Sequence, residues 1–536
     1  MTSTFHALET ARRAMTTQQY ALHTTGHNIA NANTPGYTRQ RVNFEQTQGF
    51  PTPSVNSPMI PGQLGTGVQA GSVQRVRESF LDLQFREESS KFGYWAGRFE
   101  SLQRMEDIMN EPSEHGLANT IDRFWQSLQD LAANPEDAGA RTVVVQRGEA
   151  VADTFRYAHD SLSALRRDIG HEIGEVQNEV NSLLQQINDL NKKIGETEPH
   201  GYVPNDLYDE RDRLVDRLSS LVSVQTENVK SGGKASSVAE GRMTVYLVDN
   251  SGNRINPPLV NGSNPNSVNG INITQTDGLV DKIQIGELND RNEIDTPHDE
   301  FNGDEFNTLG RLKGLIEAYG YAIPGADDTT VVKGIYPEML SDLDIMAFTF
   351  ASEFNKIHES GWSLSEINSG QHVGYQFFSD TNNAAVVNVE GYASRIRVSD
   401  EIRLSPDNIA ASGAARNGEV RNEAFAGDGS NAVLLANMKD VRFNINGTTT
   451  NIQGFYRSVI GEMAVDTAEA GRRQGNSQTL LTSIQMRKDS VSSVSLDEEL
   501  TNMIQFQHAY NAAARNITLV DEMLDRIING MGLVGR

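Results

Sequence analysis

Residues 503–527 read MIQFQHAYNAAARNITLVDEMLDRI and decide the fold at the carboxyl end of the chain. Apolar or small side chains recur there at alternating intervals of three and four residues: Met503, Phe506, Tyr510, Ala513, Ile517, Val520, Leu524, Ile527 and, beyond the stretch, Met531. This spacing is typical of the contact stripe of a coiled-coil helix. Because burial of one large apolar side chain gains roughly 1.5–3 kcal/mol, a stripe of this length requires a partner.

The amino-terminal end carries the same kind of stripe over residues 4–30. Its members follow a seven-residue rhythm, with polar side chains at two weaker positions: Leu8, Ala11, Met15, Gln18, Leu22, Thr25 and Ile29. Neither terminal stripe has a second helix close to it in sequence, so each must find its partner elsewhere. Two interpretations follow: the terminal helices pair only with each other, or subunits also use the stripes to pack together.

The amino-terminal helix is followed by Asn28-Ile-Ala-Asn-Ala-Asn-Thr-Pro-Gly-Tyr37. Three asparagines, Asn28, Asn31 and Asn33, can satisfy the unpaired backbone groups at a helix end. Pro35 and Gly36 suit the two central positions of a type II turn. The sequence therefore predicts that the helix stops here, and that extended chain and short strands follow to about residue 76.

Composition narrows the class of protein. A length of 536 residues suggests three or four domains, and the excess of 71 acidic over 46 basic residues argues against nucleic acid or a membrane surface as a partner. The absence of cysteine excludes disulfides, thiolate metal sites and thiol catalysis. The start of the chain lacks the apolar core of a cleavable signal peptide, and no apolar stretch approaches the roughly 20 residues of a membrane helix. We expect a soluble protein.

Helical periodicity governs residues 79–224. It predicts a first helix through Phe92 and Met105, a second over 117–131, and a longer third with a heptad register from Ile173 to Ile194. The polar loop 196–204 then turns the chain into another apolar stripe, which predicts a rod-like helical hairpin. Because these stripes have neighbours in sequence, we interpret them as the core of a helical domain.

Residues 223–306 and 363–454 have strand and turn patterns, with helix expected between them over 337–362 and again from residue 455. A capping box at Ser495–Glu498 is expected to open the last helix. The predicted fold is α+β, multidomain and elongated. Its paired terminal coiled-coil helices comprise 1–45 with 490–536, and a mainly helical middle domain comprises 46–222 with 307–362 and 455–489. Mainly-β outer segments comprise 223–306 and 363–454, the second being part of the outer domain or a separate small domain.

No arrangement of residues predicts catalysis, a cofactor or a metal. Gly65-Thr-Gly67 begins a match to a dinucleotide fingerprint, but a strand pattern follows where a helix should start. Gly427-Asp-Gly-Ser-Asn431 has part of a calcium loop without the final glutamate, and a turn fits it better. Asp342 and Asp344 lie two apart on a helix, hence on different faces, which argues against an acid–base pair. We therefore expect no enzyme activity.

The two terminal segments resemble one known family. Residues 28–37 resemble the amino-terminal motif of the bacterial flagellar rod, hook and hook-associated axial proteins, and three late segments resemble its carboxy-terminal motif: Ser495–Glu499, Phe506–Tyr510 and Val520–Leu524. Further segments resemble the hook–filament junction members of the family: Asn110–Ser113, Trp125–Ala132, Asn134-Pro135, Asn205–Leu207, Asp209–Asp212 and Gly427–Ala432. The resemblance covers most of the helical part and is weak in the β segments.

The resemblance implies a structural protein that polymerises at the distal end of the hook, as the first junction layer on which the filament is built. Its implied partners are other copies of itself, about eleven per layer, the hook protein, the second junction protein and a cytoplasmic export chaperone on the carboxy-terminal helices. Neither nucleic acid nor membrane is among them. It also implies type III export to the extracellular flagellum without a cleavable signal peptide.

The expected assembly interface consists of large side chains of the two stripes: Leu8, Met15, Leu22, Ile29, Met503, Phe506, Tyr510, Ile517, Val520, Leu524 and Ile527. The amino-terminal family motif supplies Asn28, Asn31, Asn33, Pro35, Gly36 and Tyr37. The alternative is another axial protein, hook or distal rod, and the long helical region 79–224 argues against it. A secreted enzyme or adhesin on an axial scaffold is the remote alternative.

Overall fold

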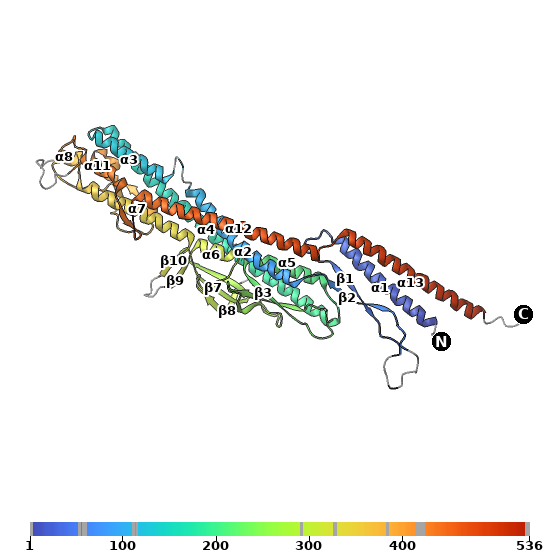
Figure 1. Cartoon of the computed structure of the whole chain (residues 1–536). Coiled ribbons are helices and arrows are strands. Elements are labelled where there is room, and N and C mark those ends of the chain that lie inside the picture. Colours follow the sequence, from blue (N-terminus) through green and yellow to red (C-terminus); the bar gives the residue numbers. More distant parts are fainter. Residues whose placement is uncertain are drawn as a thin grey trace.

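The computed structural model describes residues 4–51, 55, 62–109, 113, 116–289, 293–324, 330–381, 385–413 and 424–530. The molecule is elongated, and the two ends of the chain lie beside each other at one tip (Figure 1). Long helices run from there to the opposite end, and the larger sheets lie along one side of them (Figure 1). The predicted elongated α+β architecture is therefore confirmed.

The terminal helices pair with each other, as the sequence predicts. Helix α1 (Thr4–Ala30) packs along α13 (Leu496–Gly530). Strands β1 (Gln40–Gln46) and β2 (Val68–Arg75) form an antiparallel hairpin that packs on α1. The predicted boundary between residues 45 and 46 is wrong, because it separates two strands that pair along their whole length.

Seven helices form the body: α2 (Ser79–Met109), α3 (Leu117–Ala133), α4 (Ala138–Thr197), α5 (Asn205–Leu221), α6 (Arg311–Tyr319), α7 (Ile335–Ser360) and α12 (Ile452–Ser492). The predicted hairpin is α4 and α5, joined through a short 3-10 turn, η1 (Glu198–His200). Helix α2 packs between α12, α5 and α6. Glycine permits the closest approach, because a Cβ at Gly93 would lie 2.0 Å from the backbone oxygen of Ser220.

Two sheets cover one side of α4. One has the order β3-β4-β5: β3 (Val224–Val229), β4 (Arg242–Val248) and β5 (Arg254–Val260). The other has the order β10-β9-β7-β6, with β8 paired to β7: β6 (Asn269–Thr276), β7 (Leu279–Leu288), β8 (Ile294–Phe301), β9 (Tyr321–Pro324) and β10 (Thr330–Lys333). Strands β9 and β10 fall in the range 307–362 that we assigned to the mainly helical middle domain, before the helix expected over 337–362. They are too short to be distinguished by period, and they become strands by pairing, β9 with β7 and β10 with β9.

Buried asparagines connect α4 to these sheets. The Asn181 carboxamide accepts from the backbone N–H of Ile271 and donates to its carbonyl, each at 2.9 Å. Asn191 makes the equivalent pair of bonds with Met243, at 2.8 and 2.9 Å. These bonds satisfy strand groups that would otherwise be buried without partners.

The far end of the molecule is built from residues 362–451, and the mainly-β prediction for 363–454 is wrong. Its strands are two or three residues long: β11 (Trp362–Ser363), β12 (Phe378–Ser379), β13 (Arg397–Val398), β14 (Ala410–Ser412), β15 (Phe443–Ile445) and β16 (Thr448–Thr450). Short helices alternate with them: α8 (Leu364–Ser369), α9 (Tyr392–Arg395), α10 (Asp400–Leu404), η3 (Pro406–Asn408), α11 (Ser430–Asn437) and η4 (Met438–Asp440). Short apolar runs do not by themselves distinguish strand from helix. Here they cover an aromatic core of Phe124, Trp125, Phe350, Phe354, Phe377 and Phe378.

Candidate assembly site: the paired terminal helices and their joint with the body

The predicted stripe of α13 is the face that packs on α1. Ala513 and Val520 are buried, and five larger members of the stripe are partly buried: Met503, Phe506, Tyr510, Ile517 and Leu524. On α1, Ala11 and Thr25 are buried, and the other members are partly buried: Leu8, Met15, Gln18, Leu22 and Ile29. Ile527 remains exposed, and Met531 lies outside the described residues. We call these two stripes the inner rows.

A second group of apolar side chains on α13 lies outside its inner row. Leu500, Ile504, Leu519 and Met523 are between 42% and 55% exposed. In the heptad that the inner row defines, with Met503 at position a, Leu500 and Ile504 take positions e and b, while Leu519 and Met523 take positions c and g. The four residues, which we call the outer set, therefore lie on both flanks of the inner row. The sequence analysis missed them because it considered only one apolar stripe on each terminal helix.

Helix α1 uses a second face, which the sequence analysis also missed, to hold the hairpin. Thr17, Ala21 and Thr24 are buried on this face. The Thr17 hydroxyl donates to the backbone oxygen of Val68 at 3.2 Å, and His6 Nε2 lies 3.1 Å from the backbone oxygen of Gly65. The available signal in the sequence was the pair Thr17 and Thr24, seven residues apart, with the small residue Ala21 between them. The residues after Gly67 form strand β2, as expected, and not a helix that could bind a nucleotide.

The family motif ends α1 and fixes three chain segments to one another through Asn28. Its Nδ2 donates to the backbone oxygen of Gln40 at 2.8 Å and to Oε2 of Glu499 at 3.1 Å. Its Oδ1 accepts from the backbone N–H of Gln40 at 3.0 Å and from the Tyr37 hydroxyl at 2.8 Å. Asn28 is 1% exposed. Only an amide can donate twice and accept twice in this position.

The predicted type II turn is present. The backbone N–H of Tyr37 donates to the oxygen of Thr34 at 3.2 Å, and Gly36 has a φ of 80°, which favours glycine. Asn31 closes the helix end by donating to the backbone oxygen of His27 at 3.0 Å. Asn33 and Pro35 are exposed at the surface of the turn.

The turn docks on the start of α5. The backbone N–H of Thr38 donates to Oδ2 of Asp209 at 3.0 Å, and Gln40 Nε2 donates to Oδ1 of Asp206 at 3.0 Å. Burial raises the pKa of Tyr37, and the neighbouring carboxylates of Asp206 and Asp209 raise it further. The segment from Asn205 to Asp212, which resembles the family in sequence, thus faces the other family motif.

The break between α12 and α13 lies at the same joint. The backbone N–H of Arg39 donates to the oxygen of Ser492 at 2.8 Å. Its guanidinium lies 2.5 Å from Glu498 and 3.6 Å from Glu499, in the first turn of α13. Acidic side chains at this end of a helix also interact favourably with the helix dipole.

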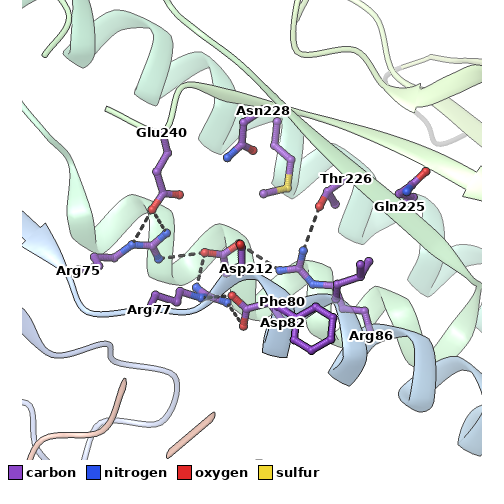
Figure 2. Close-up of a pocket in the computed structure, with 13 residues that line it drawn as sticks. Arg75, Arg77, Phe80, Asp82, Arg86, Asp212, Gln225, Thr226, Asn228 and Glu240 are labelled. Carbon is purple, nitrogen blue, oxygen red and sulfur yellow. Dashed lines mark hydrogen bonds and ion pairs between the residues drawn. The ribbon is translucent and has the colours of Figure 1, made fainter. Parts of the chain in front are cut away.

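An ionic cluster lies on the body side of the joint (Figure 2). Asp212 of α5 pairs with Arg77, with Arg75 at 2.9 Å and with Arg86 at 3.1 Å. Burial alone would raise the pKa of Asp212, but the charges of these arginines outweigh it and hold the pKa far below its usual range. Lys488 of α12 joins the cluster by pairing with Asp82 at 3.1 Å.

The structure offers no constellation for catalysis in the part of the chain that it describes. No described group of three or more His, Asp or Glu side chains could hold a metal ion. Asp344 accepts from the backbone N–H groups of Gly391 and Ala393, at 2.7 and 2.9 Å. Asp342 is directed elsewhere, and burial with Glu338 and Glu462 nearby raises its pKa to about 6. No described helix is long and apolar enough to cross a membrane.

Known proteins resemble this chain both in its terminal motifs and over its whole length. The family model described as the flagellar hook-associated protein FlgK helical domain matches residues 102–378. The model of the flagella basal body rod protein matches residues 8–38, and that of the flagellar basal body rod FlgEFG protein C-terminal matches residues 489–530. The last two matches coincide with α1 and its turn, and with α13.

Flagellar hook-associated protein 1 of Bacillus subtilis is 42% identical over 100% of both chains. The protein of that name from Escherichia coli is 25% identical over 97% of this chain and 99% of its own. The structure of the flagellar hook junction protein FlgK from Burkholderia pseudomallei has a similar fold, with a TM-score of 0.58 at 14% identity, over 76% of this chain and 100% of that one. The chain therefore belongs to the FlgK family of flagellar hook-associated proteins, which are structural components of the bacterial flagellum and not enzymes.

Proposed function

We propose that this chain polymerises at the distal end of the hook, as the first layer of the hook–filament junction on which the filament is built. The observation that carries the proposal is the outer set on α13. The inner rows already pair α1 with α13 within one chain, so Leu500, Ile504, Leu519 and Met523 are available for contacts between chains. Each such side chain gains roughly 1.5–3 kcal/mol on full burial.

The outer set suits a ring or helical layer because it occupies both flanks of α13. A subunit with one neighbour on each side makes two different contacts, and repetition of such contacts generates rings or helices. The inner rows then form the part of the assembly interface that is completed within each subunit. The outer set forms the part between subunits.

The same proposal includes the partners and the route that family membership suggests. These are about eleven copies per layer, the hook protein on one side, the second junction protein on the other, and an export chaperone on the carboxy-terminal helices. Type III export without a cleavable signal peptide would place the protein in the extracellular part of the flagellum. Cysteine absence from the chain is compatible with passage through a narrow channel in the unfolded state.

Electron microscopy of cells whose gene for this chain is deleted tests the proposal. We expect complete hooks without filaments, and flagellin shed into the medium, because the hook would lack the layer on which flagellin adds. Re-expression of the full-length chain is the control and should restore filaments. Cells without hooks would contradict the proposal and favour a hook or distal rod protein.

A further inference from the structure

Helix α13 carries two exposed apolar rows of the same form. In each row, three large apolar side chains follow one another at intervals of four residues, which makes the row a ridge along the helix. The proximal row, near the joint, consists of Leu496, Leu500 and Ile504, which are 47%, 50% and 55% exposed. The distal row, near the tip, consists of Leu519, Met523 and Ile527, which are 55%, 42% and 44% exposed. Each member of the distal row lies 23 residues after its counterpart in the proximal row.

The two rows lie on opposite flanks of α13 and both adjoin the contact with α1. A step of 23 residues corresponds to about 35 Å along a helix and to about 140° around it. In the heptad that the inner row defines, Leu496 takes position a and Ile527 takes position d, which are the positions that pack on α1. From there the proximal row passes to positions e and b, and the distal row to positions g and c. The rows therefore extend the packed face of α13 in two directions.

The chain itself does not bring the two rows together. Helix α13 is one continuous helix from the joint to the tip, so its rows are held about 35 Å apart (Figure 1). Among the described residues of α1, the exposed large apolar side chains are Phe5 and Tyr20, which lie 15 residues apart and form no matching row. Apolar ridges that project from a narrow helix pair require a cover in the assembled protein.

The symmetry of a layer decides which rows can meet. In a layer with the hook on one side and the filament on the other, all copies point in the same direction, so neighbouring α13 helices run parallel. A row packed on its own counterpart would close a pair of copies through a two-fold axis, and such a contact does not propagate. Because the rows lie on opposite flanks, the proximal flank of one copy faces the distal flank of the next.

The height at which these flanks meet follows from the side chains beside each row. Without a shift along the helix, the proximal row of one copy would face Glu498 and Gln505 of the next, which are exposed at position c. The distal row would face Asp521 and Asp525, which are exposed at positions e and b. A shift of about 35 Å instead places three apolar side chains against three others. Burial of apolar surface without burial of carboxylates favours the shifted arrangement.

On the assembly stated under Proposed function, we propose that the proximal row of each copy packs on the distal row of its neighbour, with the two copies shifted by about 35 Å along α13. The contact joins two different surfaces of the same chain, so it propagates from copy to copy. Because each contact includes a shift along the helix, its repetition produces a stepped helical layer and not a flat ring.

Cysteine cross-linking tests this contact, because the native chain contains no cysteine. The full-length Leu500→Cys/Met523→Cys variant is expressed in cells lacking the native chain, and hooks with their junctions are isolated, oxidised and probed with an antibody against this chain. We expect a ladder of dimers and larger species on a non-reducing gel. The two cysteines of one chain are about 35 Å apart, too far to form a disulfide with each other.

The matched control is the Asp521→Cys/Met523→Cys variant. Asp521 is exposed and takes the same heptad position as Leu500, but it lies at the height of the distal row. A flat layer would bring this pair together between copies, whereas the shifted layer keeps its members apart. We therefore expect the control to give monomers only.

A variant that builds filaments but gives no ladder from Leu500→Cys/Met523→Cys would overturn the proposal and leave the proposed function standing. A ladder from the control, alone or of equal intensity, would also overturn it. The Ile504→Cys/Ile527→Cys variant places cysteines at the next positions of the same rows, should give the same ladder, and replaces the first variant if that one builds no filaments. If deletion cells lack hooks, the proposed function fails independently.

Discussion

Substitution of Asn28 by aspartate should disconnect the terminal helices from the body without altering the body itself. The side chain is nearly isosteric, but it loses both donated hydrogen bonds, to the Gln40 oxygen and to Glu499. Each unmatched buried acceptor costs about 1–3 kcal/mol. Two carboxylates at the observed 3.1 Å also repel by about 5 kcal/mol at an effective dielectric of about 20.

The variant can escape this repulsion by protonating the new carboxyl group. A carboxylic acid with a usual pKa near 4 requires about 4 kcal/mol to remain protonated at pH 7, because each pKa unit corresponds to about 1.4 kcal/mol. We therefore expect Asn28→Asp to destabilise the packing of α1 on α13 by about 4 kcal/mol at pH 7. The new carboxyl has a raised pKa in the folded state, so the defect should shrink by about 1.4 kcal/mol per pH unit as the pH falls from 7 toward about 4.

Hydrogen exchange of the full-length protein measures this effect. Amides in α1 and α13 should exchange up to roughly a thousandfold faster in Asn28→Asp, while amides in α4 and α7 should keep their rates. Asn33→Asp is the matched control, since it makes the same chemical change at an exposed position of the same turn. Adding Glu499→Gln to the variant should restore part of the protection by removing the repulsion. Equal exchange in Asn28→Asp and Asn33→Asp would refute the reasoning.

Three further predictions concern the inner rows, the body and pH. Ile517→Asp places a charge in the inner row and should release α1 from α13, which hydrogen exchange would show as faster exchange in both helices, without changing the melting temperature of the body. Asn516→Asp, at an exposed position, should leave both the exchange rates and the melting temperature unchanged. Gly93→Ala should lower that melting temperature, with a loss of about 1–3 kcal/mol from its contact with Ser220, whereas Gly461→Ala has nothing within 4 Å and should stabilise by up to about 1 kcal/mol. Burial lowers the pKa of His358 from 6.5 to about 4, so the unfolded state binds its proton first and the free energy of unfolding should fall by up to roughly 3 kcal/mol between these pH values. Urea unfolding of the native protein and His358→Gln should reveal this difference, and parallel pH profiles would contradict it.

The sequence predicted those features of the site that depend on residues close to one another along the chain. The three-four spacing from Met503 to Leu524 identified the face of α13 that packs on α1. Pro35 and Gly36 predicted the type II turn because their preferred backbone angles match it. The helical hairpin of α4 and α5 followed from heptads separated by a polar loop.

The rest depends on contacts between residues far apart in the chain. The bond between Asn28 and Glu499 joins positions 471 apart, and no local pattern specifies it. Likewise, the cluster around Asp212 contains charged side chains from the hairpin, α2 and α12, and in the sequence each of these is indistinguishable from ordinary surface charge. Periodicity reports which face of an element is buried, but it does not name the partner.

The central claim is that the inner rows hold α1 and α13 together within one chain, whereas the outer set joins neighbouring chains. Electron microscopy of deletion cells that express the Ile504→Asp/Leu519→Asp variant tests it most directly. Leu434→Asp, at a similarly exposed position far from α13, is the control. The account predicts hooks without filaments for the double variant, with native hydrogen exchange in α1 and α13 of its purified monomer, and normal filaments for the control. Normal filaments on cells expressing the double variant would contradict it.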